Sequence, residues 1–221
     1  MAKAKSQRLR SVAGGARGTR KRASVARAAE VKRETSETAI RVRVDLDGTG
    51  KAKVDTGIPF LDHMLDALSR HSQIDLDVHA RGDTHVDDHH TVEDVGIALG
   101  QAIDSALGAK VGIGRFGHAV VPLDEALVAV TVDLSGRPFL TYNVKLRHQR
   151  VGNFDVELVH DFMLALMNAA KMNLHINKEY GRNPHHVIEA AFKALARALR
   201  AAVALDPRIK GIPSTKGTLR D

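Results

Sequence analysis

The chain has 221 residues, no cysteine, 43% hydrophobic residues and a formal net charge of +7 at pH 7. The absence of cysteine excludes disulfides, thiolate metal sites and thiol catalysis, and no apolar run reaches the roughly eighteen residues that span a bilayer. The length allows one large domain or two small ones with a real core. We therefore expect a soluble, cytoplasmic protein that does not bind membranes.

The excess positive charge lies at the start of the chain. Residues 1–33 carry eleven Lys and Arg side chains and one acid, so this segment has a net charge of +10 and the remainder has −3. Its small and basic side chains offer too little apolar surface for a packed core. We predict a disordered basic tail over residues 1–33 and a folded domain over residues 34–221. An organelle-targeting segment is the second interpretation, and a nucleic-acid-binding arm is the third because the tail lacks aromatic residues for base stacking.

Hydrophobic periodicity predicts alternating strands and helices from residue 39 onward. Apolar residues at every second position indicate strands, whereas a spacing of three to four residues indicates helices. The predicted strands cover residues 40–46, 51–55, 74–78, 117–123, 126–134, 138–145 and 172–177. The predicted helices cover residues 60–68, 88–107, 155–170 and 185–204.

The sequence repeats together with the order of its elements. Residues 61–68 align with residues 159–166 at an offset of 98, and the strands that follow keep this offset. Such internal similarity is typical of a duplicated domain. We predict an α+β fold of two ββαβα-like halves of the split β-α-β type, at about residues 38–115 and 116–205, with sheets on one side and helices on the other.

Each half carries a His-His-x-x-Glu motif at the start of a predicted helix. Helix positions four apart share a face with Cβ atoms roughly 5–6 Å apart, so the first histidine and the glutamate of each motif can hold one divalent ion. The second histidine lies about 100° further round the helix and should face a second metal or one shared with another subunit. The motifs comprise His89, His90 and Glu93 in the first half, and His185, His186 and Glu189 in the second.

Three segments resemble the imidazoleglycerol-phosphate dehydratase family of histidine biosynthesis. They are residues 56–65, 88–94 and 183–190, which read TGIPFLDHML, DHHTVED and NPHHVIEA. The resemblance implies metal-dependent dehydration of imidazole glycerol phosphate to imidazole acetol phosphate by a homo-oligomer of 24 chains. It also implies two Mn²⁺ ions per active site, although imidazole and carboxylate ligands without thiolate also suit Zn or Fe.

The resemblance implies eight metal ligands, one of which departs from the family pattern. The family usually has a His, or in some members a Glu, where this chain has Asp161, and the internal repeat aligns Asp161 with His63. An aspartate is a good oxygen donor for Mn²⁺, and His160 is the alternative ligand. The implied set is His63, His89, His90, Glu93, Asp161, His185, His186 and Glu189.

The resemblance also implies a binding site for the substrate and its phosphate. Guanidinium and ammonium groups are common phosphate partners, and the loop of residues 211–219 adds hydroxyls and backbone amides. The implied catalytic residues are Glu37, His71, Glu93 and Glu189, with Glu37 or a metal-bound water moving the proton. The implied substrate contacts are Glu37, His63, His71, His89, Arg115, Arg137, His185, Lys193, Ser214, Thr215 and Lys216.

Two other functions compete with dehydration. A nucleic-acid-binding protein would use the basic tail and leave the histidines without a role. A metal-dependent hydrolase would use the same ligands to direct water to an ester, and its products would be an alcohol and phosphate. We expect a phosphorylated imidazole as the small-molecule substrate and no nucleic-acid partner.

Overall fold

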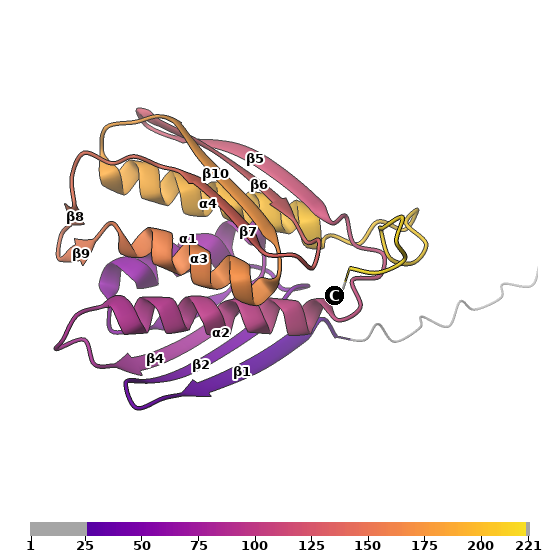
Figure 1. The fold of residues 1–221 in the computed structure, drawn as a ribbon, viewed down its shortest axis with the longest axis horizontal. Helices are drawn as coiled ribbons and strands as arrows, with labels where there is room; N and C mark the ends of the chain where they lie inside the picture. Colours follow the sequence, from indigo (N-terminus) through magenta and orange to yellow (C-terminus); the bar gives the residue numbers. More distant parts are fainter. Residues whose placement is uncertain (1–25, 220–221) are drawn as a thin grey trace, which may run out of the picture.

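Two four-stranded sheets form the outer layers of the protein, and four helices lie between them (Figure 1). The computed structural model describes residues 26–219, so residues 1–25 of the tail predicted for residues 1–33 lie outside the described residues. The strands are β1 (Ala28–Glu34), β2 (Thr38–Asp45), β3 (Ala52–Asp55), β4 (Asp75–Gly82), β5 (Phe116–Leu123), β6 (Ala126–Asp133), β7 (Phe139–Asn143), β8 (Arg150–Val151), β9 (Phe154–Asp155) and β10 (Asn173–Tyr180). The helices are α1 (Pro59–Ser72), α2 (His89–Leu107), α3 (Leu158–Ala170) and α4 (Pro184–Val203).

The two halves of the chain share one topology. The first sheet has the order β1-β2-β4-β3 and the second has the order β5-β6-β10-β7. In each sheet the last two strands of the order run parallel and the other neighbours run antiparallel. Each half therefore places its sheet on one side and its helices on the other, and the two helical faces meet. The predicted α+β fold with two similar halves is confirmed.

Strand β1 shows that the basic tail does not extend to residue 33. Residues 28–33 pair antiparallel with β2 along their length, and Val31 packs against the core opposite Val42. The alternation was weak in the sequence because Val31 is the only large apolar side chain on the inner face, which it shares with Ala29 and Arg33. The boundary at residue 34 is wrong, and β1 supplies the first half with the strand that corresponds to β5.

The third helix begins later than its periodicity predicted. We expected a helix from residue 155, but β8 and β9 form a small hairpin that occupies residues 150–155. The Asp155 side chain accepts the backbone N–H of Glu157 at 3.1 Å, and α3 starts at Leu158. Strands this short leave no periodic signal in a sequence.

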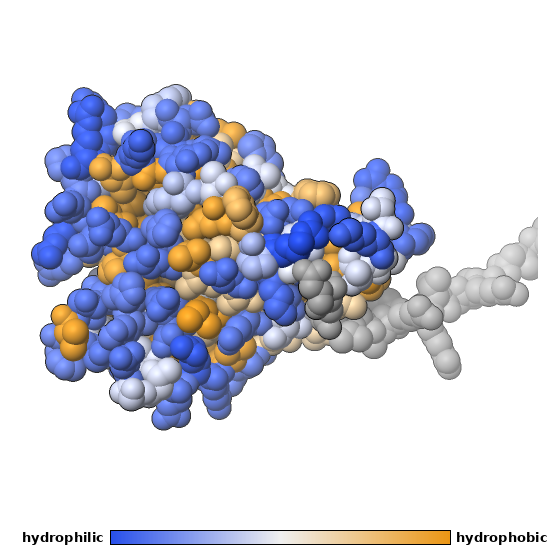
Figure 2. Space-filling model, in the orientation of Figure 1, coloured by the Kyte–Doolittle hydropathy of each residue, from blue (hydrophilic) through white to orange (hydrophobic). Residues whose placement is uncertain are grey.

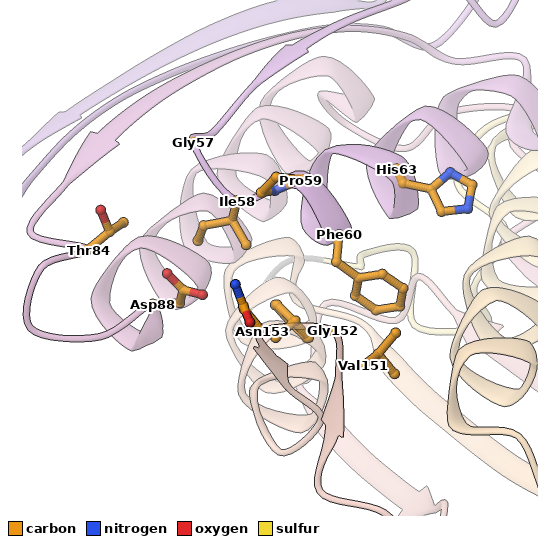
Figure 3. A pocket seen from close by; sticks show the side chains of 11 residues that line it. Gly57, Ile58, Pro59, Phe60, His63, Thr84, Asp88, Val151, Gly152 and Asn153 are labelled. Atoms are coloured by element: carbon orange, nitrogen blue, oxygen red, sulfur yellow. The ribbon is translucent and has the colours of Figure 1, made fainter.

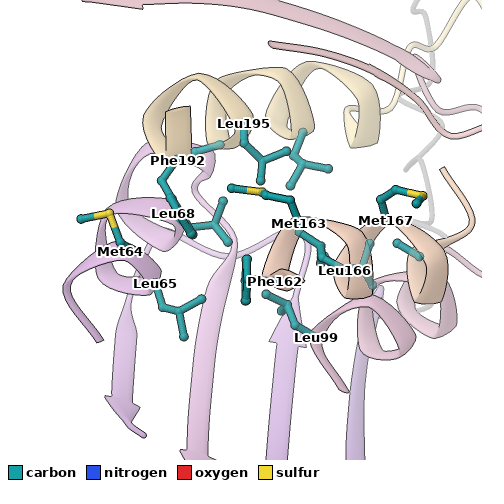
Figure 4. Packing of buried hydrophobic residues seen from close by; sticks show 14 of the residues in the cluster. Met64, Leu65, Leu68, Leu99, Phe162, Met163, Leu166, Met167, Phe192 and Leu195 are labelled. Atoms are coloured by element: carbon teal, nitrogen blue, oxygen red, sulfur yellow. The ribbon is translucent and has the colours of Figure 1, made fainter. Parts of the chain in front are cut away.

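Apolar side chains from all four helices meet between the sheets (Figure 4). The rings of Phe162 in α3 and Phe192 in α4 lie 5.4 Å apart between centroids. Helices α2 and α3 approach closely because α2 has glycine at the contact. A Cβ added at Gly100 would lie 2.5 Å from the carbonyl oxygen of Leu166, and one at Gly96 would lie 2.9 Å from that of Phe162. This packing sets the position of both helices that carry the histidine motifs.

The surface is mostly hydrophilic on the face that Figure 2 shows, with hydrophobic side chains gathered mainly between the two sheets. Within residues 26–219, none of the helices combines the length and apolarity that a membrane span requires.

Candidate metal centre

Helices α1 and α4 bring three candidate ligands together. His63 extends from α1, and His185 and Glu189 lie one turn apart on α4. The Nε2 atoms of His63 and His185 lie 3.3 Å and 3.1 Å from Oε2 of Glu189. One ligand atom from each of the three residues lies within 4.8 Å of the others. We call His63, His185 and Glu189 the first cluster.

Local sequence explains how α4 presents this cluster. Pro184 occupies the first turn, where its missing N–H has no partner to lose. The side chain of Asn183 caps the helix and accepts the backbone N–H of His185 at 3.0 Å. The helix therefore begins just before the motif, so that His185 and Glu189 share one face.

The charge of Glu189 is held by its neighbours. Only 13% of its side chain is exposed, and this burial acts to raise its pKa. The Lys193 ammonium, 2.7 Å from Oε1, together with His63 and His185, outweighs burial and lowers the pKa of Glu189 to about 2. The carboxylate is therefore ionised at neutral pH and suited to bind a cation.

His71 lies on the same side of the helix pair, two turns after His63 in α1. Burial lowers its pKa, and the positive charges of Lys193 and Arg197 lower it further. A neutral imidazole beside two cations can donate a hydrogen bond to an anion without adding charge. His71 and Lys193 are thus both close to the first cluster. The resemblance implied that both residues contact the substrate.

The corresponding residues of the other half form a more open pair. His89 at the start of α2 places Nδ1 3.4 Å from Oδ2 of Asp161 in α3. Glu93, one turn further along α2, is exposed. Nδ1 of His160 lies 3.3 Å from Oδ1 of Asp161, and its ring packs against that of Tyr142. We call His89, Glu93 and Asp161 the second cluster, in which Asp161 rather than His160 approaches His89.

The second histidine of each motif faces away from its neighbour. The rings of His89 and His90 are inclined by 76°, and those of His185 and His186 by 82°. Nδ1 of His90 lies 3.1 Å from Asp83, and this hydrogen bond raises the pKa of His90.

Nδ1 of His186 lies 2.7 Å from Oε2 of Glu125. The hydrogen bond from His186 is the main cause that lowers the pKa of Glu125 to about 2. Both second histidines therefore use one ring nitrogen for a carboxylate of their own chain.

A cavity of about 670 Å³ opens beside the first cluster. Figure 3 shows His63 and Phe60 of α1 on one side of it, Asp88 at the start of α2 on the other, and Asn153 from the β8–β9 hairpin. A second cavity, of about 570 Å³, lies on the side of His89 and Asp161. Burial and the neighbouring Asp87 raise the pKa of Asp88. Space for a small polar ligand thus adjoins both clusters.

Several predicted phosphate contacts lie at the opposite end of α4. The backbone N–H of Arg115 donates to the carbonyl of Ala202 at 2.9 Å, seventeen residues beyond His185 in α4. At a rise of about 1.5 Å per residue, that separation is about 25 Å along the helix. Arg115 also pairs with Asp133 and donates to the carbonyl of Pro213 at 2.9 Å.

Four other predicted phosphate residues, Arg137, Ser214, Thr215 and Lys216, lie in segments that contact Arg115. The N–H of Leu134 donates to the carbonyl of Arg115 at 3.1 Å, and Arg137 follows three residues later. The contact with Pro213 joins Arg115 to the loop that contains Ser214, Thr215 and Lys216, in which Ser214 accepts the N–H of Lys216 at 3.2 Å. Within one chain, this group does not meet the first cluster.

Comparison with known proteins identifies the family. The model of the imidazoleglycerol-phosphate dehydratase family matches residues 56–199. A protein of that name from Ralstonia pickettii (strain 12J) is 60% identical over 196 residues, covering 88% of this chain and 100% of its own length. Another from Geobacillus kaustophilus (strain HTA426) is 56% identical over 195 residues, with the same coverage. The chain belongs to the imidazoleglycerol-phosphate dehydratase family.

Solved structures of family members have the same fold. The imidazoleglycerol-phosphate dehydratase of Staphylococcus aureus subsp. aureus N315 is 37% identical with a TM-score of 0.74, and the match covers 81% of this chain and 99% of that one. The Pyrococcus furiosus enzyme, solved in complex with (S)-C348, is 36% identical with a TM-score of 0.75, covering 85% and 99%. The predicted family, and with it the class of water-removing lyases, is confirmed.

Sequence analysis missed two carboxylates that contact the motif histidines of this family member. Asp83 and Glu125 each lie at a turn and reach Nδ1 of His90 or His186. The internal repeat could have indicated Glu125. Strands β2 and β6 are equivalent eight-residue strands, and Glu37 and Glu125 immediately precede them. The repeat could not have indicated Asp83, because the equivalent position after β10 is Gly181.

Proposed function

We propose that this chain removes water from imidazole glycerol phosphate to form imidazole acetol phosphate, with two Mn²⁺ ions in each active site. The observation that carries the proposal is the first cluster, in which His63, His185 and Glu189 converge in a chain of the dehydratase family. The expected place of the reaction is histidine biosynthesis.

The donor groups fit a divalent ion of the Mn²⁺ type. The first cluster offers two imidazole nitrogens and an ionised carboxylate, and the second offers one imidazole and two carboxylates. Such mixed nitrogen and oxygen ligands suit Mn²⁺, while Zn²⁺ and Fe²⁺ can bind the same groups. Each cluster leaves coordination positions for substrate and for His90 or His186, which turn away from the clusters of their own chain. We infer that these two histidines complete sites in neighbouring copies.

The reaction requires a proton to leave a carbon atom that has no adjacent carbonyl group. Bound Mn²⁺ supplies positive charge that favours the deprotonated imidazole ring. The hydroxyl on the side-chain carbon next to the ring departs with the C–O electron pair and gains a proton to become water. A base takes a proton from the following carbon, and the resulting enol becomes the ketone by proton transfer.

Glu37 is suited to move these protons. It lies in the turn between β1 and β2, its side chain is 51% exposed, and its Oε2 lies 3.7 Å from Nδ1 of His90. An exposed carboxylate beside a predicted metal ligand can reach a substrate held by that metal, and a positioned acid or base contributes roughly 10²–10⁴-fold to rate.

The phosphate is expected to bind cations from two copies of the chain. Lys193 and His71 are near the first cluster. Arg115, Arg137 and the loop with Ser214, Thr215 and Lys216 are about 25 Å away along α4, which exceeds the length of the substrate. This separation supports a homo-oligomer in which the far end of one subunit completes the site of another.

The outer face of the second sheet is suited to contacts between copies. Phe116 and Phe139 are each 59% exposed there, and Val120 is also exposed. The matching face of the first sheet carries charges such as Arg43 and Asp77. Phe116 and Phe139 lie on the two edge strands of this sheet, β5 and β7, so with Val120 they make its outer face more apolar than that of the first sheet and favour it as an interaction surface. Closed symmetry is the usual form of a homo-oligomer. Light scattering should find a large assembly that Val120→Glu weakens. An assembly of 24 chains is the hypothesis that the measured mass would test.

The activity is tested with the full chain, stripped by a chelator and reloaded with Mn²⁺. Imidazole glycerol phosphate should give one equivalent of a ketone, identified by mass spectrometry and NMR, and the metal-free protein should be inactive. Release of inorganic phosphate without a ketone would instead favour the hydrolase. A reloaded protein that leaves the substrate unchanged would contradict the proposed function.

A further inference from the structure

Glu125 makes three contacts that join two loops to the start of α4. Its Oε1 accepts the backbone N–H groups of Asn183 at 2.8 Å and Arg182 at 3.2 Å. Its Oε2 lies 2.7 Å from Nδ1 of His186. Both carboxylate oxygens are therefore occupied, one by the backbone before the helix and the other by the imidazole ring.

These contacts select one tautomer of His186. A glutamate is ionised at neutral pH and can only accept hydrogen bonds, so Nδ1 of His186 is the donor. Nε2 is then the nitrogen left to bind a metal; it points away from Glu125, and its nearest carboxylate is the exposed Asp124, whose Oδ2 is 3.8 Å away and beyond hydrogen-bond distance. Carboxylates that hold the far nitrogen of a histidine in this way orient metal ligands and raise their basicity.

In the first half, a different residue contacts Nδ1 of the equivalent histidine, His90. Glu37 occupies the position before β2 that Glu125 occupies before β6, yet its closest approach to Nδ1 of His90 is 3.7 Å. Asp83, at the end of β4, lies 3.1 Å from that nitrogen instead. The side chain of Glu37 is 51% exposed, compared with 33% for Glu125.

We propose that Glu125 and Asp83 are positioning residues that engage Nδ1 of His186 and His90 and so turn Nε2 toward the metal, and that Asp83 thereby leaves Glu37 for the substrate. The two repeat-equivalent glutamates have then divided their roles, one orienting a ligand and the other moving protons. This inference rests on the proposed function, because it assigns the residues that support its metal ligands.

Glu125→Gln is the decisive substitution. Glutamine has one oxygen where glutamate has two, so it cannot serve both the backbone N–H groups and the imidazole N–H. If its oxygen stays on the backbone, its NH₂ group faces His186, and the ring must accept at Nδ1 and carry its proton on Nε2. We expect Mn²⁺ to bind about 10–100-fold more weakly, as is typical when such a supporting contact is lost.

The experiment measures the Mn²⁺ dissociation constant of the full chain by equilibrium dialysis for wild type, Glu125→Gln and Asp83→Asn. Glu179→Gln, at an exposed position on β10, is the matched control and should bind Mn²⁺ like the wild type. Glu37→Gln should also retain Mn²⁺ affinity while losing turnover. Two-bond ¹H–¹⁵N spectra of the metal-free protein should show His186 protonated on Nδ1 in the wild type, which tests the tautomer even if a variant fails to fold.

The outcomes separate this inference from the proposed function. A wild-type chain that binds no Mn²⁺ would overturn the proposed function itself. A wild-type chain that binds Mn²⁺ normally, with Glu125→Gln equal to it or with His186 protonated on Nε2, would overturn the role of Glu125. A Glu37→Gln variant that loses Mn²⁺ as Asp83→Asn does would overturn the division of roles.

Discussion

The two clusters occupy equivalent places in a duplicated fold, yet their surroundings differ. Glu189 of the first cluster is nearly buried and is paired with Lys193, whereas Glu93 of the second is exposed. The residue equivalent to Lys193 in α2 is Ile97, and the residue equivalent to His63 is Asp161. Duplication thus preserved the backbone positions of the ligands, while later substitutions around them set the charge and openness of each cluster.

Loss of a motif histidine should have the largest effect. His185→Ala and His89→Ala each remove an imidazole ligand, so metal content and kcat/KM should both fall, the latter by more than about 100-fold, beyond the loss typical of a supporting contact. Elemental analysis and steady-state kinetics measure the two quantities. His79→Ala, which removes a histidine of β4 whose Nδ1 lies 3.5 Å from Asp55, should change neither. Equal metal loss in this control would contradict the assignment.

Lys193→Ile makes α4 resemble α2 and tests the asymmetry directly. Removing a charged partner of a phosphate costs about 1.5–3 kcal/mol, so KM should rise roughly 10–100-fold. Ile97→Lys provides the reciprocal change and should leave KM close to the wild-type value. A Lys193→Ile variant with unchanged KM would show that the cation acts only on Glu189.

Gly100→Ala tests the packing difference between the two helices. The added methyl group would meet the backbone of α3 at 2.5 Å, and overpacking of this kind lowers the free energy of unfolding by about 1–3 kcal/mol. The equivalent residue in α4 is Ala196, which is buried, and Ala196→Gly should cost only about 1 kcal/mol through backbone entropy. Urea denaturation of both variants gives the two values. If α2 needs glycine for its close contact with α3, the free energy of unfolding should fall more for Gly100→Ala than for Ala196→Gly.

Acid stability should show the nearly buried, charged surroundings of Glu189 by a smaller effect. The pKa of Glu189 falls from 4.5 to about 2 on folding, so its ionised form stabilises the native state above pH 4.5 and this contribution disappears as the pH falls toward 2. Glu189→Gln should therefore flatten the decline in melting temperature of the metal-free protein between pH 4.5 and 2. A Glu189→Gln curve that runs parallel to the wild-type curve would contradict this effect of the surroundings of Glu189.

Local patterns predicted most elements but missed those with little periodic signal. The long helices were found because their apolar stripes extend over several turns. Strand β1 was missed because Val31 is its only large apolar side chain, and its pairing with β2 supplies the stability that its own sequence lacks. The hairpin of β8 and β9 was missed because two-residue strands have no period. Asp83 and Glu125 were missed because only the folded chain brings their carboxylates to the histidines: Asp83 reaches His90 across the turn before α2, and Glu125 reaches His186 across 61 residues of chain.

The sequence by itself determined the duplicated pattern, the family and the pairing of each first histidine with a glutamate, because positions four apart on a helix meet wherever that helix packs. Only the tertiary structure decided which distant groups join them. His63 reaches Glu189 across 126 residues of chain because α1 packs on α4, Asp161 approaches His89 because glycines let α2 and α3 come close, and Arg115 lies at the far end of α4. Contacts between elements depend on how whole surfaces pack, and no local spacing encodes them.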